Sequence, residues 1–312
     1  MALNAASAFF NPQVLARMIG AGFANIPILY GSGAVDVDPT MPYGKEYLGL
    51  TINIPYSSPP VAWQVLADGV AGTPAAFSIG NAAGTNTTPE TETVLRAYWG
   101  LDMTSWARSN PLDPYGEARR QGLEGFAQIL ETQLIAKACD NTAGIWAAYI
   151  NDVSTSSDPL LSHDAVVDAK TLLGSEGYND DFVLGAVHSH TIGTLWKRKD
   201  STGRPWLVEN PGEVTAGGAR IYRLAPLGIP ILVSDLMPVS IGTGPGGANV
   251  YTSAFFRRGA LALYLNPNLS ARSVQEPNTD SQLDGLNCYF TAHRRKKLQN
   301  RAKPGTALVT HQ

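Results

Sequence analysis

Two stretches in the first third of the chain alternate apolar and polar residues with a period of two. Leucine and isoleucine occupy every second position of residues 47–54, and residues 92–103 repeat the pattern with Leu95 and Trp99 on one face. Strict alternation is typical of a half-buried strand. We therefore expect two strands that can pair across residues 55–90, which are rich in Gly, Pro and Thr and nearly free of charge. So long a connection without a core of its own usually serves as a functional or interaction loop.

The period changes to that of a helix after these strands. Asp113 can cap a helix that begins at Pro114, and Glu117 suits the first turn of its dipole. An apolar face then continues to about Cys139, which gives a helix of roughly 38 Å at 1.5 Å per residue. A helix of that length can brace a flat, elongated molecule, and a long core helix of any α+β protein fits the pattern equally well. The expected face consists of Tyr115, Ala118, Leu123, Phe126, Ile129, Leu130 and Leu134.

From Ser162 onward the pattern indicates a separate α/β unit. Ser162 is expected to cap one helix and Ser189 the next, with a strand buried on both faces at residues 182–187 between them. Two further apolar runs, residues 228–235 and 249–265, continue the unit.

The first 43 residues show little periodicity. Residues 11–20 form one short helix candidate, too short to be stable alone. The rest is interpreted as an arm that lies against another structure, and a frayed terminus is the alternative. The first positive charge, Arg17, follows the first apolar run, which is the wrong order for a secretory signal.

Composition narrows the class of protein. The 312 residues allow about two domains. Charged residues make up 16% of the chain, well below the usual ~25%, and Gly and Pro are enriched. A net charge of −3 and a pI near 6.0 give no global case for binding nucleic acid or membrane. Cys139 and Cys288 form neither a disulfide framework nor a CxxC pair, so we expect a reducing compartment. No apolar run approaches the length of a membrane span.

The strongest hint of an enzyme is the His188-Ser189-His190 sequence. Two imidazoles two positions apart on a strand share a face and can bind a metal ion. A third ligand is missing, because no Asp or Glu stands nearby at a ligand-like spacing; the other histidines are His163, His293 and His311. Ser189 also lacks the G-x-S-x-G context of a nucleophile. We interpret the three residues as part of a helix start.

The glycine-rich residues 242–247, GTGPGG, have the spacing of a dinucleotide-binding loop. Their context does not fit, because Pro238 interrupts the preceding strand, Pro245 lies inside the motif, and a strand begins near Asn249 where a helix should open. The motif is predicted to be the tip of a hairpin.

Residues 285–312 carry a net charge of +6 and no acidic residue. Such a run can contact DNA phosphates, but it lacks the interleaved aromatic residues that stack on bases. We interpret the run as a solvated or subunit-contacting tail, and of these we favour contact with other subunits. The basic residues are Arg294, Arg295, Lys296, Lys297, Arg301 and Lys303.

Three segments, in this order, resemble the major capsid proteins of tailed double-stranded DNA bacteriophages. They are FVLGAVHSHTIGTL at residues 182–195, GIPILVSD at residues 228–235 and FFRRGALAL at residues 255–263. Together with the long helix and the extended loop they cover most of the chain. A low content of charge agrees with this resemblance, since a shell subunit must offer several faces to copies of itself.

The resemblance implies an α+β fold in five parts, without a catalytic, cofactor-binding or metal site. These are an N-terminal arm (1–43), an extended β-hairpin loop (44–104), a peripheral domain with a long spine helix (105–140 and 264–298), an α/β axial domain (141–263) and a basic C-terminal tail (299–312).

The implied function is structural: self-assembly into pentamers and hexamers of an icosahedral shell that encloses double-stranded DNA. The implied partners are other copies of the chain, portal, scaffolding or decoration proteins, and packaged DNA through non-specific contact, with no membrane. The implied location is the virion, assembled in the host cytoplasm. A metal-dependent enzyme that uses His188 and His190, or a tail or fibre component, is the alternative.

Overall fold

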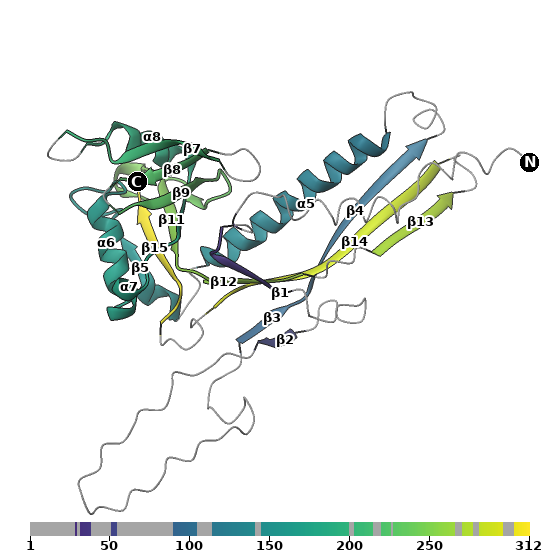
Figure 1. Cartoon of the computed structure of the whole chain (residues 1–312), viewed down its shortest axis with the longest axis horizontal. Helices are drawn as coiled ribbons and strands as arrows, with labels where there is room; N and C mark the ends of the chain where they lie inside the picture. Colours follow the sequence, from purple (N-terminus) through teal and green to yellow (C-terminus); the bar gives the residue numbers. More distant parts are fainter. Residues whose placement is uncertain are drawn as a thin grey trace, which may run out of the picture.

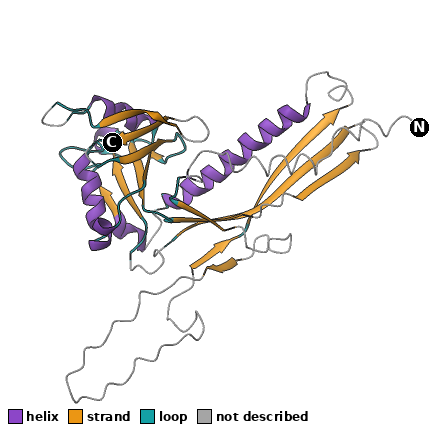
Figure 2. Cartoon of the chain, in the orientation of Figure 1, coloured by secondary structure: helices purple, strands orange, loops and turns teal. Residues whose placement is uncertain are grey.

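Two sheets and one long helix organise the computed structural model of the chain (Figure 1). The long helix is α5 (Pro114–Ala138), and it lies along one sheet, while the second sheet forms a separate body with shorter helices around it (Figure 2). The structure describes residues 29, 32–38, 51–54, 90–104, 114–140, 145–199, 203–214, 220–225, 227–265, 270–276, 281–295 and 303–312.

The first sheet has five strands in the order β1-β12-β14-β13, with β4 on the other edge of β14. β1 pairs with β12 in parallel and the other pairs are antiparallel. Because β14 is long, β12 and β13 follow one another along the same edge, which makes the sheet narrow and elongated. The strands are β1 (Val35–Asp38), β4 (Leu95–Thr104), β12 (Leu261–Leu265), β13 (Ser270–Glu276) and β14 (Ser281–Arg294).

The second sheet has eight strands in the order β5-β15-β11-β6-β9-β8-β7, with β10 paired to β11. β6 pairs with β9, and β15 with β5, in parallel; the remaining pairs are antiparallel. Its strands are β5 (Ile150–Asp152), β6 (Leu184–Val187), β7 (Leu207–Val214), β8 (Arg220–Leu224), β9 (Ile229–Val233), β10 (Val239–Ser240), β11 (Val250–Phe256) and β15 (Thr306–His311). Its helices are η4 (Ile145–Tyr149), α6 (His163–Leu172), α7 (Ser175–Asn179), α8 (Ser189–Lys197) and η5 (Pro245–Gly247).

Two apolar cores lie on opposite faces of the second sheet. One core joins the C-terminal half of α5 to both sheets and includes Leu134 and Phe256. The other packs α6 and α8 against the sheet and includes Leu195 and Phe255. Since neighbouring side chains of a strand point to opposite faces, Phe255 and Phe256 of β11 each anchor one core.

The predicted long helix is confirmed, and so is most of its described apolar face. Phe126, Leu130 and Leu134 are buried. Ile129 was placed on the same face but is 40% exposed, whereas Ile135 is buried. The buried face of α5 therefore includes Ile135 and excludes Ile129.

Of the two predicted N-cap residues, Ser162 is confirmed and Ser189 is wrong. Ser162 caps α6, because its hydroxyl accepts a hydrogen bond from the backbone N–H of Ala165. Ser189 does not cap α8. The cap is His188, whose Nδ1 accepts from the N–H of His190 at 3.1 Å. An imidazole nitrogen replaces the usual hydroxyl or carboxylate acceptor there, which is why the expected cap residue was one position late.

The predicted pairing across the long, nearly uncharged connection is also confirmed. β2 (Thr51–Ile54) pairs antiparallel with β3 (Glu90–Thr93), while residues 55–89 between them lie outside the described residues. The single strand expected at residues 92–103 is divided at Val94 into β3 and β4. The helix candidate at residues 11–20 also lies outside the described residues.

The strand pairing does not follow the predicted bounds of the five parts of the chain. β4 was assigned to the extended loop, β12 largely to the axial domain and β1 to the arm, yet all three belong to the five-stranded sheet. The expected C-terminal tail is wrong for residues 303–312, because β15 lies between β5 and β11 inside the eight-stranded sheet. These pairings join residues distant in sequence, so local patterns did not reveal them.

Candidate functional site

The two histidines of the His188-Ser189-His190 sequence contact an aromatic ring instead of converging on a metal ion. The His190 ring stacks on Tyr251 at 5.0 Å between centroids, and the His188 ring lies 5.2 Å from it. Asp235 is 4.0 Å from His188 Nε2. Among the described residues, no group of three or more His, Cys, Asp or Glu side chains is arranged to hold a metal. The helix-start interpretation accounts for this sequence.

Sequence reasoning gave no role to His311, which completes this aromatic cluster. Its ring stacks on Tyr251 at 6.1 Å, and its Nε2 lies 2.9 Å from the Ser253 hydroxyl. Burial lowers the pKa of His311 from 6.5 to about 4, and the hydrogen bond with the Gln312 carbonyl offsets part of that shift. His311 is therefore neutral at physiological pH, and its ring packs against Tyr251 of the neighbouring strand β11.

We expect acidification to destabilise the eight-stranded sheet through His311. The pKa of His311 is lower in the folded than in the unfolded protein. Its contribution to the free energy of unfolding is therefore fully present above pH 6.5 and is lost as the pH falls toward 4. The loss amounts to up to about 3 kcal/mol. Thermal unfolding measured at several pH values should show a steeper decline for the wild type than for His311→Gln. Equal slopes for both proteins would contradict the assignment.

The glycine-rich motif closes a hairpin, as predicted. η5 lies between β10 and β11, and the Gly242 N–H donates to the Asn249 side-chain oxygen at 3.1 Å. β11 begins at Val250, so no helix follows to bind a pyrophosphate. The dinucleotide-loop interpretation therefore fails on geometry.

The expectation that the basic run contacts neighbouring subunits is wrong for Arg294. Its side chain is buried, it donates to the carbonyl oxygens of Asp140 at 3.1 Å and Thr306 at 3.4 Å, and its guanidinium lies 3.8 Å from the Trp146 ring centroid. Burial lowers the pKa of Arg294 to about 10, so it stays charged at neutral pH.

Two more members of the basic run have partners within the chain. Arg295 donates to the Asp36 carboxylate and to the Gly259 carbonyl, which ties β14 to β1. Lys303 Nζ lies 5.5 Å from the Tyr149 ring centroid. Lys296, Lys297 and Arg301 lie outside the described residues.

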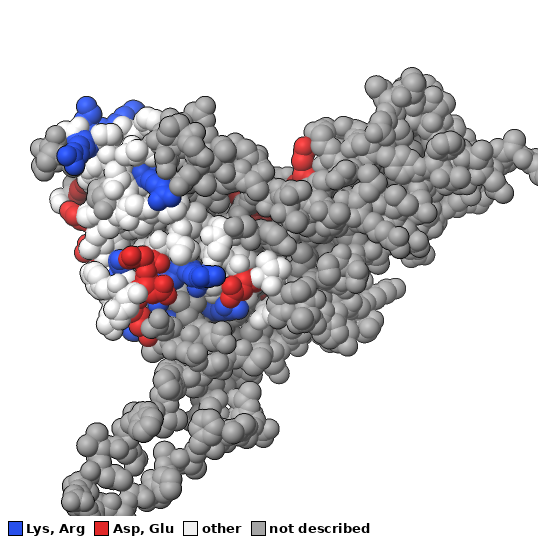
Figure 3. Space-filling view, viewed as in Figure 1, with Lys and Arg blue, Asp and Glu red and all other residues white. Residues whose placement is uncertain are grey.

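A second buried arginine holds the turn after β11. Arg257 is fully buried, and its Nη2 donates to the Asp180 carboxylate at 2.9 Å while Nη1 lies 3.6 Å from Glu176. Its backbone N–H donates to the Gly305 carbonyl at 2.7 Å. The turn is thereby tied to α7 and to the chain just before β15. On the face drawn in Figure 3, the charged side chains of the described residues form small groups, with white, uncharged described surface between them.

The long helix is tied to both sheets by acidic residues. Glu92 of β3 binds Lys137 of α5 at 2.5 Å and His293 of β14 at 3.2 Å. Burial raises the pKa of Glu92, but the hydrogen bonds from His293 and Lys137 outweigh it and the net shift is downward. On the other side of α5, Glu131 accepts from the Ser234 hydroxyl at 3.1 Å, and burial raises its pKa. These contacts fix the helix between the two sheets.

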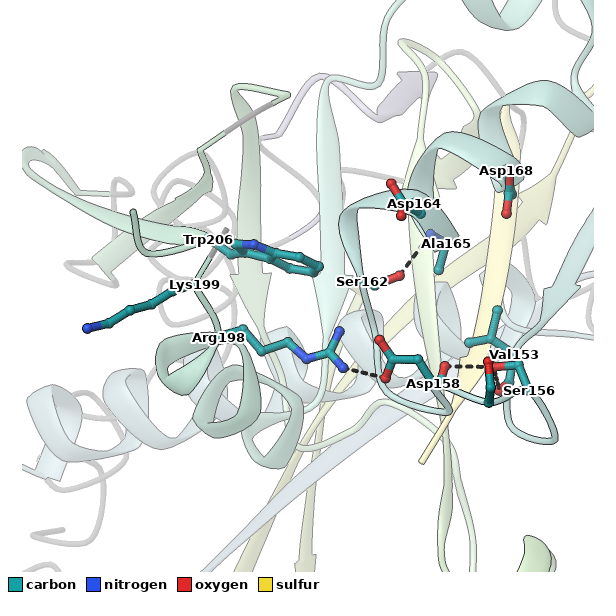
Figure 4. Close-up of a pocket in the computed structure, with 11 residues that line it drawn as sticks. Val153, Ser156, Asp158, Ser162, Asp164, Ala165, Asp168, Arg198, Lys199 and Trp206 are labelled. Carbon is teal, nitrogen blue, oxygen red and sulfur yellow. Dashed lines mark hydrogen bonds and ion pairs between the residues drawn. The ribbon is translucent and has the colours of Figure 1, made fainter. Parts of the chain in front are cut away.

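A pocket of about 580 Å³ opens beside the N-terminus of α6 (Figure 4). Three of the polar side chains that line it, those of Arg198, Asp158 and Ser162, have structural roles. Arg198 donates to Asp158 and lies over the Trp206 ring at 5.2 Å, and the Ser162 hydroxyl is the helix cap. The arrangement holds a loop against two helices and presents no nucleophile with a partner base.

Solved capsid proteins have the same fold as this chain. It is similar to the capsid protein of an empty GTA particle with a TM-score of 0.55 and 14% identity, over 92% of this chain and 90% of that one. The capsid protein of Ralstonia phage GP4 matches with a TM-score of 0.54 and 10% identity, over 93% and 90% of the two chains. The SrpI encapsulin of Synechococcus elongatus PCC 7942 matches with a TM-score of 0.52 and 15% identity, over 71% and 75%.

No protein-family model matches the sequence, and no curated protein is similar to it. At these identities the structural similarity establishes the fold, which is the α+β fold of tailed-phage major capsid proteins, as the resemblance implied. None of the helices in the described ranges combines the length and apolar composition that crossing a bilayer requires.

Proposed function

We propose that the chain is a structural subunit that assembles with copies of itself into the shell of a phage-like particle. The observation that carries this proposal is the extent of the match: more than nine tenths of the chain superposes on phage and GTA capsid proteins, which are themselves covered to 90%. Similarity over whole chains includes the parts that a shell subunit uses to contact its neighbours.

The architecture supports this role. A subunit of a closed shell must form several different contacts, and an elongated molecule with two separate bodies offers more faces than a sphere. In our proposal the eight-stranded sheet with its helices is the axial domain, and the five-stranded sheet with α5 is the peripheral domain. The β2–β3 pair is the base of the extended loop that reaches a neighbouring subunit.

In finer detail we infer pentamers and hexamers that form an icosahedral shell around double-stranded DNA. The further partners would be portal, scaffolding or decoration proteins, and DNA held through non-specific contact. The location would be the virion after assembly in the host cytoplasm. No catalytic activity, cofactor or membrane belongs to this role.

The match to the SrpI encapsulin complex favours a second candidate, an encapsulin-like shell. That match covers less of both chains than the phage and GTA matches do. Nuclease-protected DNA in particles from the native source would support the phage-like shell, and particles without protected DNA would favour the second candidate.

Deletion of the nearly uncharged connection between β2 and β3 tests the shell proposal directly. We expect the purified wild-type protein to form closed particles or rings in electron micrographs. A variant with residues 57–89 replaced by a short Gly/Ser turn should stay folded, since β2 and β3 can pair as a hairpin, but should not close shells. Normal particles from the shortened chain would exclude the connection from essential subunit contacts, and a wild type that never assembles would contradict the shell proposal.

A further inference from the structure

Helix α8 begins with an unusual cap, the imidazole ring of His188. Its Nδ1 accepts a hydrogen bond from the His190 N–H at 3.1 Å. The usual N-cap residues, Ser, Thr, Asn and Asp, offer an oxygen acceptor whose charge does not change near neutral pH. A histidine side chain does change its charge there, since it titrates near pH 6.5 in model peptides. The first turn of α8 therefore depends on an acceptor that a proton can remove.

The cap hydrogen bond determines which form of the ring is present. Nδ1 can accept only when it carries no proton, so the neutral ring holds its proton on Nε2. Nε2 lies 4.0 Å from a carboxylate oxygen of Asp235, which favours a proton at that nitrogen. A second proton would bind Nδ1 and turn it into a donor that faces the His190 N–H. The ring would then have to turn away from the helix, because the positive end of the helix dipole also repels a charged imidazole.

Water reaches the His188 ring, and its neighbours leave it as the group on which mild acid acts. The His188 side chain is 19% exposed. A proton on the exposed His190 would add a cation–π attraction to the Tyr251 ring, on which His190 stacks. His311 becomes charged only in stronger acid, because its pKa is about 4. The titratable groups around the ring are Asp235 after β9, His190 on α8, Tyr251 on β11 and, next to Tyr251, His311 on β15.

We infer that His188 is an acid-sensitive cap, which holds the first turn of α8 at neutral pH and releases it in mild acid. The neutral ring caps the helix, and the protonated ring pairs with Asp235 instead. The change is confined to the first turn, whose N–H groups have no acceptor within the helix, while Ile192 and Leu195 keep the rest of α8 in the core. This inference does not rest on the proposed function, since it concerns the folded chain alone.

Hydrogen exchange of the full-length protein, measured by mass spectrometry of peptides that contain residues 188–192, tests the cap. Protection is compared at about pH 8 and about pH 5.5, after correction for the intrinsic effect of pH on exchange. Over this range a histidine of ordinary pKa changes its charge, while His311 stays neutral. Protection of the first turn of α8 in the wild type should fall about two- to thirtyfold at the lower pH, which is the range for the loss of one N-cap.

Two substitutions of His188 separate the cap from its titration. His188→Asn places an amide oxygen near the position of Nδ1, so the variant should keep the cap and show equal protection at both pH values. His188→Ala removes the acceptor, so its protection should be low at both. His190→Asn is the matched control, because it also removes one histidine but leaves the cap acceptor in place. It should keep the dependence on pH that the wild type shows.

Three results would overturn the inference. One is equal protection of the wild type at both pH values. Another is a fall in protection that His188→Asn shows as strongly as the wild type, because the fall would then come from another group. The third is loss of the pH dependence in His190→Asn, which would assign it to His190. If His188→Asn does not fold, the wild type and His188→Ala decide, since they should exchange alike at the lower pH and differ at the higher one.

Discussion

Replacing Phe126 with Asp is expected to leave the subunit unfolded and insoluble. Phe126 lies on the buried face of α5 and is only 8% exposed, in the core that joins the helix to both sheets. The substitution removes a large apolar side chain and places a carboxylate among apolar groups, which together cost at least about 4 kcal/mol. That is much of the roughly 5–15 kcal/mol that stabilises a domain. Soluble yield and thermal unfolding measure the result.

Ile129→Asp is the matched control on the same helix. Ile129 is 40% exposed, so the new carboxylate stays hydrated and the expected loss is about 0.5 kcal/mol. Both substitutions introduce the same charge three positions apart, and only the face of the helix differs. If Phe126→Asp unfolds at the temperature of the wild type, the assigned core of the subunit is wrong.

The elements predicted correctly were those whose signal is local. A cap and a proline marked the start of α5, alternation marked β2 and β4, and unbroken apolar runs marked β6 and β9. Each of these signals lies within the segment that it describes. The family resemblance then supplied the arrangement, which the fold of the solved capsid proteins matches.

The elements predicted incorrectly depend on partners far along the chain. β15 has the sequence TALVTH, and its Ala-Leu-Val core is a short apolar run that could have indicated a buried strand. The basic residues before it dominated the interpretation as a tail. Only its pairing with β5 and β11, from 50 or more residues away, shows that it lies inside a sheet.

Local sequence also could not reveal that Arg294, within the basic run, is buried inside the subunit. A cluster of like charges in sequence predicts an exposed surface, because isolated charges are costly to bury. Arg294 and Arg295 are adjacent and chemically identical, yet their side chains have different surroundings at the end of β14. One is enclosed by Asp140, Thr306 and Trp146, while the other lies at the surface beside Asp36. Charge content alone could not distinguish them.

This difference gives a sharp prediction for two neighbouring substitutions. Arg294→Gln should destabilise the subunit by about 2–4 kcal/mol, because glutamine is too short to keep both carbonyl hydrogen bonds and loses the contact with Trp146. Arg295→Gln breaks a half-exposed ion pair with Asp36 and should cost no more than about 1 kcal/mol. Both changes remove one positive charge from the same run, so any general effect of charge is matched.

Thermal unfolding and particle assembly of the two variants distinguish the internal role from an external one. We expect Arg294→Gln to lower the melting temperature clearly, and to impair assembly only through the loss of folded subunits. A residue that contacted neighbouring subunits or DNA would show the reverse, with an unchanged melting temperature and a specific loss of particles or of retained genome. That result for Arg294→Gln would refute its internal role. Because Arg294 donates to carbonyls on both sides of β14, near α5 and at the start of β15, its loss should loosen the junction between the two sheets.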